Sequence, residues 1–387
     1  MDLSWIDDAK KCILAKEKIV VTRNRGKVPY TTHNHRFDDR SDPDQIAWWT
    51  NGFWGGILWQ LYKATGEPLY RSEAEELEKK QDQQLFKADS LSHDSGFTWL
   101  PTAVTDYRMT GNQESRNRGL LAASNLAGRF NPAGQGFIRA WNGVSPWGGD
   151  TTGWAIIDCM MNLPLLYWAS DELKDPRFKN TAMRHADTAM HNFIREDGSA
   201  RHICEFDPCT GEYVRDYGGQ GYGVGSSWTR GQAWALYGFT LSFLHTGAQR
   251  YLQTAEKVAA YFMSNIPDDG IILTDFRVPE GEPNYVDSTA AAIASCGLLT
   301  LAGQVEKDAE KDETQRQKLS QDYRNAALKM LKALYDNFFD ADPEDDELIE
   351  KCTAAYHDKE HEFTIIYGDY YFIEAIWKLT GTEQFIW

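Results

Sequence analysis

A pattern of paired helical stretches recurs along the chain. Each pair consists of an apolar stretch with helical periodicity, a short break, and a second, more charged stretch, and the pairs occupy residues 56–80, 103–127, 163–193 and 235–263. Residues 374–381 repeat the apolar half at the C-terminus, and residues 288–305 form a further Ala- and Leu-rich stretch. Four breaks read Thr-Gly, at Gly66, Gly111, Gly247 and Gly381. Glycine directly after the last periodic residue is typical of a helix C-cap, so we expect helical hairpins.

The breaks near residues 65, 110, 171, 246, 304 and 380 give six units of about 64 residues each. Because a hairpin can bury its apolar face only against neighbouring units, six of them predict an all-α fold that closes into a ring. No Pro/Ser/Gly-rich linker divides the sequence, so we expect a single domain over residues 1–387. Long Gly- and aromatic-rich connections at 129–153 and 202–227 are typical of segments that carry function.

The net charge of the chain limits the classes of binding partner that we expect. The net charge of −17 would repel nucleic acid and anionic membrane surfaces, so neither is expected as a partner. The N-terminal residues lack the apolar region of a signal peptide and no run reaches the ~18 apolar residues of a membrane span, which favours a cytoplasmic protein with six reduced cysteines. We expect a monomer or a dimer. The acidic stretch 340–352 is interpreted as a solvated face or an insertion.

Common nucleophile, phosphate-binding and metal motifs do not occur in the sequence. The His33/His35 and His357/His361 pairs have no Cys or carboxylate at ligand spacing nearby, so we expect no metal and no cofactor. Thirteen per cent of the residues are aromatic, with 14 Trp, which favours flat stacking surfaces of the kind that bind sugar rings.

Two aspartates are the candidates for catalysis. The sequence neighbours of Asp158 are apolar: Ile156, Ile157, Cys159, Met160 and Met161. Its carboxylate would therefore be poorly hydrated and its pKa raised, as a general acid needs. A buried helix cap or a partner of an arginine is the alternative. Asp94, in a His-Asp-Ser-Gly-Phe loop, precedes Asp158 by one hairpin unit, so both side chains could lie at the same end of a ring.

Possible substrate-binding residues surround these acids. Trp49, with Trp48, Phe53 and Trp54, could form a stacking wall or a core cluster. Gln220, Arg230 and Trp234 follow a Gly-rich loop that opens onto a helix, where Arg230 could hold a carboxylate bidentately or form a structural ion pair. His202 could orient a proton or serve packing only.

From Trp48 to the C-terminus the chain closely resembles unsaturated glucuronyl hydrolases of glycoside hydrolase family 88. The resemblance rests on WTNGFWGGILWQLYKATG, HDSGF, IIDCMMNLPLLYWA, GSSWTRGQAWALYGF, DSTAAAIASCGLL and YGDYYFIEAIWKL. It implies an (α/α)6 barrel of six helical hairpins, with Asp158 as general acid and base, Asp94 as the second essential carboxylate, and substrate-binding roles for Trp49, His202, Gln220, Arg230 and Trp234. Where the family has an acid, this chain has Asn51, to which we assign no catalytic role.

The implied substrate is an oligosaccharide from a polysaccharide lyase, with a 4,5-unsaturated uronic acid at its non-reducing end. Asp158 would protonate C4 of the vinyl ether and help water to add at C5, so the usual rule on carboxylate separation in glycosidases does not apply. Alternatives are an unsaturated rhamnogalacturonyl hydrolase, a sugar epimerase that uses paired histidines, and a non-catalytic sugar-binding barrel. The lack of a basic residue before Gln220 slightly favours unsulfated substrates.

Overall fold

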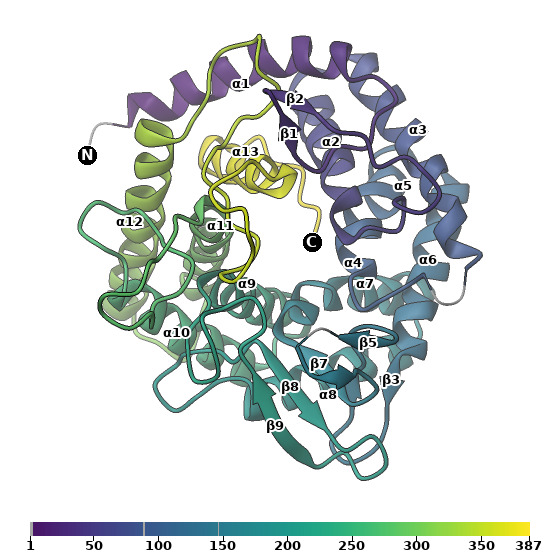
Figure 1. The fold of residues 1–387 in the computed structure, drawn as a ribbon, viewed down its shortest axis with the longest axis vertical. Helices are drawn as coiled ribbons and strands as arrows, with labels where there is room; N and C mark the ends of the chain where they lie inside the picture. Colours follow the sequence, from purple (N-terminus) through teal and green to yellow (C-terminus); the bar gives the residue numbers. More distant parts are fainter. Residues whose placement is uncertain (1–2, 88–89, 146) are drawn as a thin grey trace.

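Two concentric layers of helices form a ring, as Figure 1 shows in a view along its axis. The structure is a computed structural model that describes residues 3–87, 90–145 and 147–387. The inner layer consists of α2 (Phe53–Thr65), α4 (Ser95–Trp99) continuing through η2 (Leu100–Val104) into α5 (Thr105–Thr110), α7 (Leu163–Leu173), α9 (Thr229–Thr246), α11 (Ser288–Val305) and α13 (Ile366–Thr380). The outer layer consists of α1 (Ser4–Arg23), α3 (Pro68–Leu85), α6 (Gln113–Gly128), α8 (Pro176–Asn192), α10 (Gln249–Ser264) and α12 (Glu313–Asn337). The predicted (α/α)6 barrel is confirmed.

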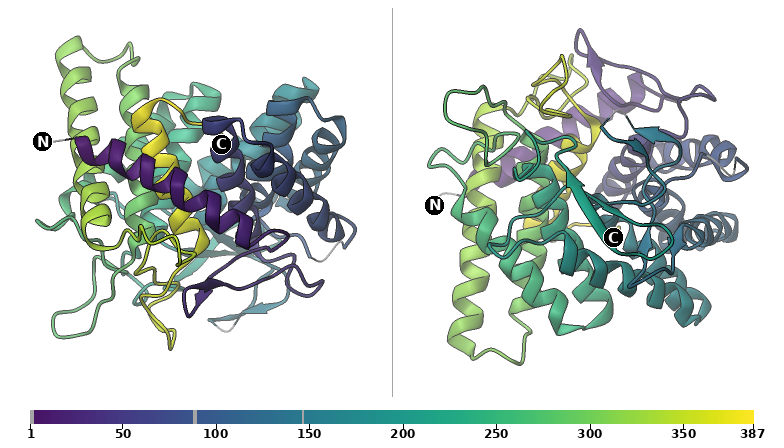
Figure 2. Two further views of the ribbon diagram at one scale, coloured as in Figure 1. Left: turned by 90° about the horizontal axis from the view of Figure 1, so that it is seen from above. Right: turned by 60° about the horizontal axis from the view of Figure 1, so that its bottom comes forward.

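Five hairpins consist of helices adjacent in sequence, and the sixth unit is made from the two ends of the described chain. Helix α13 packs against α2 on one side and α11 on the other, and α1 lies across its outer face (Figures 1 and 2). The repeat pattern predicted six units, but it did not show that the first helix supplies the outer half of the last one.

The Thr-Gly breaks end helices as the sequence predicts. Gly66, Gly111, Gly247 and Gly381 all have the left-handed conformation, with φ between 66° and 77°. In each case the glycine N–H donates back to a carbonyl of the last helical turn. The α7–α8 break instead uses Lys174, whose φ is 55°.

The two layers differ in burial because the inner helices have protein on both sides. Helix α9 has 14 buried residues among 18, whereas α12 has 7 among 25. Helix α11 is long and apolar enough to cross a membrane by length and composition, which the sequence reading missed, but it packs between α9, α12 and α13 as a core helix.

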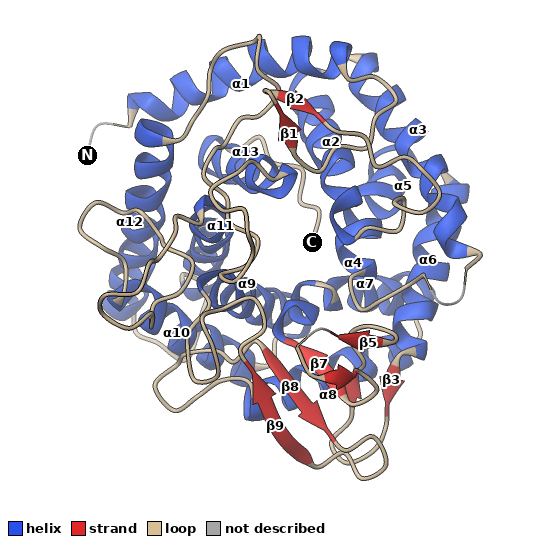
Figure 3. Ribbon diagram, in the orientation of Figure 1, coloured by secondary structure: helices blue, strands red, loops and turns tan. Residues whose placement is uncertain are grey.

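The strands and long connections lie on one side of the helical ring (Figures 2 and 3). They include β1 (Thr32–His33), β2 (Arg36–Phe37), β3 (Phe130–Asn131), β4 (Phe137–Ile138), β5 (Val144–Ser145) and β6 (Gly149–Asp150), which form two-stranded antiparallel pairs. A three-stranded antiparallel sheet consists of β7 (Trp154–Ile156), β8 (Ile203–Phe206) and β9 (Tyr213–Tyr217). This sheet positions the candidate catalytic residues.

The acidic stretch 340–352 is not simply a solvated face, contrary to the sequence interpretation. Asp346 and Glu347 are buried. Asp346 accepts from Nε of Arg23 at 2.8 Å and from the N–H of Phe37 at 2.9 Å, so it connects α1 to the β1–β2 hairpin. Composition could not reveal this role because a buried acid and a solvated one have the same side chain.

The αL glycines allow a direct test. Replacing Gly66 with Ala should lower the free energy of unfolding by about 1 kcal/mol, because the left-handed conformation is unfavourable for a residue with a Cβ. No atom lies within 4 Å of the added methyl group, so a steric clash would not contribute. Urea unfolding would measure the effect.

Gly303→Ala is the matched control, because its added Cβ also meets nothing within 4 Å but the residue lies inside α11. It should raise stability by about 0.5–1 kcal/mol. Shifts of the same sign in the two variants would contradict the assignment of Gly66 as an αL cap.

Candidate active site

Strand pairing brings Asp158 and His202 together. In the β7–β8 ladder Ile156 pairs with Ile203, and the N–H of Ile157 donates to the carbonyl of His202 at 3.0 Å. Asp158 then follows in the 3₁₀ helix η3 (Ile157–Met161). The Nε2 atom of His202 lies 3.9 Å from Oδ1 of Asp158.

A glycine turn after β9 fixes the orientation of the His202 ring. Tyr217, the last residue of β9, pairs with Ile203, and the chain then passes through Gly218 and Gly219 to Gln220. The Gln220 N–H donates to Nδ1 of His202 at 3.0 Å. A Cβ on Gly219, whose φ is +57°, would lie 2.0 Å from Nδ1, so only glycine allows this approach.

Asn162 couples Asp94 to the Asp158 segment. Asp94 precedes α4 and accepts from the hydroxyl of Ser92 at 3.1 Å. The Asn162 side chain accepts from the N–H of Phe97 at 2.8 Å and donates to the carbonyl of Asp158 at 3.2 Å. Two successive hairpin units therefore meet here, as the spacing of the two aspartates suggests.

Both aspartates are protonated more readily than in water. Burial raises the pKa of Asp94 to about 7, against which the Ser92 hydrogen bond acts. Burial, and then the charge of Asp94, raise the pKa of Asp158 to about 8, although Arg230 opposes the shift. A negative charge on Asp94 therefore favours the protonated form of Asp158.

His202 is a neutral donor in this arrangement. Burial lowers its pKa to about 3. Since Nδ1 accepts a backbone N–H, the hydrogen-bond network assigns the ring proton to Nε2, the atom that faces Asp158. Within the described residues, neither Nε2 of His202 nor Oδ1 of Asp158 has a hydrogen-bond partner, although both are buried. Buried polar atoms left open in this way are suited to meeting a bound molecule.

An aromatic cavity of about 490 Å³ adjoins these residues. Its lining consists of Tyr30, Trp48, Trp49, Trp141, Trp147, Gln220, Ala354, Ala355, Asp358 and Tyr367. The ring of Trp141 lies 6.2 Å from that of His93, next to Asp94, and the ring of Trp147 lies 6.3 Å from that of His202. The cavity is therefore beside both aspartates, and its volume suits a small sugar ligand.

The predicted binding residues fall into two groups. Trp49 and Gln220 line the cavity, whereas Trp234 is fully buried and packs 5.0 Å from Phe97 and 5.6 Å from Tyr371. Neighbouring rings cover Trp234 in the structure, and its predicted substrate-binding role stays a prediction. Of the remaining candidate wall, Phe53 and Trp54 are core residues and Trp48 reaches the cavity.

Arg230 forms the structural ion pair that was one of its two predicted alternatives. Its Nη1 atom donates to Asp287 at 2.6 Å and to the carbonyl of Thr353 at 2.7 Å, and Nη2 donates to the carbonyl of Ala354. The side chain is 1% exposed. Both terminal nitrogens are occupied, so a bidentate clamp on a substrate carboxylate does not fit; its positive charge still acts on Asp158.

Sequence reasoning missed Asn162 and several cavity residues. Asn162 lies four positions after Asp158, a spacing that places neighbours on a helical face and could have indicated it. Trp141 and Trp147 lie in the 129–153 connection, which the sequence marked as functional without singling out a residue. Asn51, given no catalytic role, is buried and donates to the carbonyls of Gln45 and Ile46.

Possible metal ligands gather elsewhere. Within the described ranges, one group consists of His35, Asp340 and Asp345, and a second of Asp340, Glu347 and Glu350. The Lys16 ammonium group lies 3.4 Å from the carboxylate of Asp340 and supplies a positive charge to it. These groups share no residue with the candidate active site.

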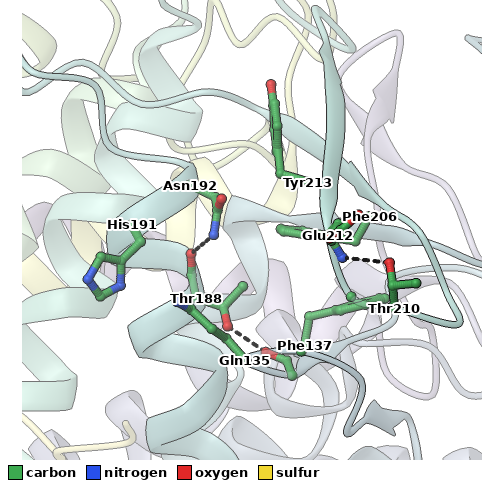
Figure 4. A pocket seen from close by; sticks show the side chains of 12 residues that line it. Gln135, Phe137, Thr188, His191, Asn192, Phe206, Thr210, Glu212 and Tyr213 are labelled. Atoms are coloured by element: carbon green, nitrogen blue, oxygen red, sulfur yellow. Dashed lines mark hydrogen bonds between the residues drawn. The ribbon is translucent and has the colours of Figure 1, made fainter.

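A second cavity of about 300 Å³ lies between α8 and the β8–β9 hairpin, and Figure 4 shows it. Thr188 donates to the carbonyl of Gly136, and Asn192 to that of Thr188, so these polar groups bond to the protein itself. It contains none of the predicted site residues.

Comparison with known proteins gives consistent matches over most of the chain. The model of Glycosyl Hydrolase Family 88 matches residues 14–374. The unsaturated glucuronyl hydrolase of Bacillus sp. (strain GL1) is 36% identical over 337 residues, which cover 86% of this chain and 86% of the relative. The unsaturated chondroitin disaccharide hydrolase of Streptococcus pneumoniae is 31% identical over 343 residues, which cover 88% of this chain and 83% of the relative. A solved UGL variant with dGlcA-Glc-Rha-Glc has a TM-score of 0.86 at 32% identity and covers 96% of each chain.

The raised pKa of Asp158 predicts how stability depends on pH. Folding favours its protonated form, so its contribution to stability is complete below the unfolded pKa, near 4, and is lost as pH rises through about 8. Asp158→Asn should therefore gain stability relative to the wild type as pH rises from 5 to 9. The difference should reach a few kcal/mol, at about 1.4 kcal/mol per pKa unit.

Urea unfolding at pH 5, 7 and 9 would measure this difference. Asp150→Asn serves as control, because Asp150 is exposed and its Thr152 hydrogen bonds lower its pKa, so that it is ionised in both the folded and unfolded states and its contribution should not change between pH 5 and 9. Parallel stability curves for the wild type and Asp158→Asn would contradict the buried, protonated state of Asp158.

Proposed function

The chain belongs to Glycosyl Hydrolase Family 88, and we propose that Asp158 is the general acid of its reaction and that Asp94 controls the pKa of this acid. The enzyme is an unsaturated glucuronyl hydrolase. It releases the 4,5-unsaturated uronic acid from the non-reducing end of oligosaccharides that polysaccharide lyases produce from glycosaminoglycans or other uronate polysaccharides.

The observation that carries the proposal is the open Oδ1 atom of Asp158. It is buried, has no hydrogen-bond partner within the described residues, and belongs to a carboxyl group whose pKa is raised to about 8. At neutral pH this group carries a proton and lies beside an aromatic cavity. A carboxylic acid held in this state is suited to protonating a weakly basic carbon.

The reaction is the addition of water across the C4–C5 double bond. Asp158 transfers its proton to C4, and the positive charge that forms at C5 is shared with the ring oxygen. The Asp158 carboxylate then takes a proton from water as the water oxygen bonds to C5, which regenerates the acid. The hemiketal opens, and the hemiacetal left at C1 releases the second sugar as an alcohol.

Asp94 helps to keep the acid protonated. Burial is the larger cause of the raised pKa of Asp158, and the negative charge of Asp94 raises it further. Asn162 connects the two segments and holds them in one geometry. Asp94 thus acts through Asp158: it raises the pKa of that acid.

His202 and Arg230 also support this step. The Nε2–H of His202 points towards Asp158 and is free to donate to the attacking water or to a ring hydroxyl. The Arg230 charge, although the side chain is buried, favours the uronate carboxylate in an enzyme whose net charge is −17.

Asp158→Asn should lower kcat by at least about 10³-fold, because the amide cannot donate the proton or accept it back. Loss of the ultraviolet absorbance of the conjugated double bond would measure the rate on a panel of unsaturated disaccharides, with rhamnogalacturonan fragments included. Asp150→Asn, on the exposed β5–β6 hairpin, is the matched carboxyl-to-amide control. Wild-type rates in Asp158→Asn would exclude it as the acid.

The pH profile tests the role of Asp94 separately. In the wild type, kcat/KM should fall as pH rises through the pKa of Asp158, about 8, because Asp158 is then deprotonated and cannot act as the acid. Asp94→Asn removes the negative charge that raises this pKa, so the alkaline limb should move to lower pH. An alkaline limb that stays in place, with only its height reduced, would show that Asp94 acts in some other way.

A further inference from the structure

Helix α1, the β1–β2 hairpin and the segment that follows α12 meet at a group of acids outside the candidate active site. Asp340, Glu347 and Glu350 each have one carboxylate oxygen within 4.8 Å of those of the other two. The antiparallel bridge between Phe339 and Ile349 explains part of this arrangement, because side chains alternate along paired strands and residues 340 and 350 therefore lie on one face.

Glu347 supplies the observation that points to a ligand. Its side chain is 2% exposed. Its Oε1 atom lies 2.6 Å from Nδ1 of His35, whereas Oε2 is buried and has no hydrogen-bond partner within the described residues. A buried carboxylate oxygen without a partner is costly, which indicates that a bound group completes its contacts. Since Oε1 is engaged, Oε2 is the atom of Glu347 that can bind a cation shared with Asp340 and Glu350.

Two basic groups reach Asp340 and Glu347. The Lys16 ammonium group lies 3.4 Å from the Asp340 carboxylate and donates to the backbone carbonyls of both acids. The His35 ring contacts Glu347 and also lies 3.5 Å from the carboxylate of Asp345. Even when His35 is protonated, only two positive charges face these three carboxylates.

Glu350 adds a fourth carboxylate, for which the described part of the chain has no cation. It forms no ion pair with a described residue, and the ammonium group of the neighbouring Lys351 pairs with Glu362 at 3.0 Å. The Arg23 guanidinium, from α1, pairs with Asp346. Four negative and two positive charges leave an excess of two negative charges, which one divalent cation would neutralise.

We propose that Asp340, Glu347 and Glu350 bind Ca²⁺ in a structural site that joins α1 and the β1–β2 hairpin to the segment before α13. Carboxylate oxygens are the ligands that hard cations prefer, and oxygens as much as 4.8 Å apart can share Ca²⁺ at its usual ligand distances of about 2.3–2.6 Å, whereas Mg²⁺ needs them closer. The sequence pattern did not reveal this site, because His35 and Lys16 meet Glu347 across 312 and 331 positions. The proposal does not depend on the hydrolase activity.

Thermal unfolding of the EDTA-treated protein, with and without CaCl₂ at constant ionic strength, tests the site. The wild-type Tm should rise by about 3 °C when Ca²⁺ is present at about 100 times its Kd, and titration calorimetry should give one site. Glu350→Gln should bind Ca²⁺ at least about tenfold more weakly and lose this rise, because a charged ligand is gone. The variant should fold, since Glu350 has no ion pair to lose within the described residues, and in EDTA its Tm should equal or exceed the wild-type value because like-charge repulsion is reduced.

Glu344→Gln is the matched control. Glu344 lies in the same segment, its side chain is 79% exposed, and it belongs to neither group of possible metal ligands. This variant should retain the wild-type affinity for Ca²⁺ and the same rise in Tm. An equal rise in the wild type and Glu350→Gln would mean that Ca²⁺ only screens the net negative charge, and would overturn the proposal. So would no rise in the wild type, or a larger rise with MgCl₂ at the same concentration.

Discussion

Partial burial of the Asp158 side chain, which is 14% exposed, raises the pKa of its carboxyl group, and this desolvation is the constraint on which the site depends. The nearest potential cation, His202, is itself neutral because burial lowers its pKa. An ionised carboxylate without a close cation is costly in such surroundings, so the group retains a proton instead. The apolar inner helices produce these surroundings, and the β7–β8–β9 sheet holds the acid at their edge.

The distribution of positive charge follows from the same constraint. If the Arg230 guanidinium bonded to Asp158, the acid would be ionised at neutral pH and could not donate a proton. The structure places Arg230 instead against Asp287 and the 353–354 backbone, where it stabilises a wall of the cavity. Arg230 thereby lowers the pKa of Asp158 from a distance and holds the backbone at Thr353 and Ala354.

Much of the fold, and the proximity of Asp94 and Asp158, could be predicted from the sequence, whereas the catalytic roles of the two aspartates stay predictions. Glycine caps are local signals, because a glycine directly after a stretch with helical periodicity can be recognised in the sequence without knowledge of tertiary contacts. Asp158 could also be recognised, since an acid among Ile, Cys and Met is locally anomalous. The domain organisation over 1–387, the cytoplasmic location and the oligomeric state stay predictions.

The residues that the sequence did not reveal depend on contacts between distant segments. Both Trp49 and Trp234 pack against Phe97, and only the structure shows that Trp234 is fully buried whereas Trp49 lines a cavity. Asp358 lies in a charged run, and the sequence did not show that it lines the cavity. Asp346 is an acid whose partners, Arg23 and Phe37, are about 310–320 positions away.

Closure of the ring by α1 and α13 also bears on how the molecule forms during synthesis. Helix α1 precedes the other described helices in the sequence, yet the helix that it covers, α13, follows all of them. Until then, the apolar face of α1 has no native partner, and α2 lacks its neighbour on one side. Contacts across such a separation form slowly and leave intermediates with exposed apolar surface. We therefore expect the hairpins to assemble in sequence into an open arc, with docking of α1 and α13 as the late step that completes the barrel and seals the environment of Asp158.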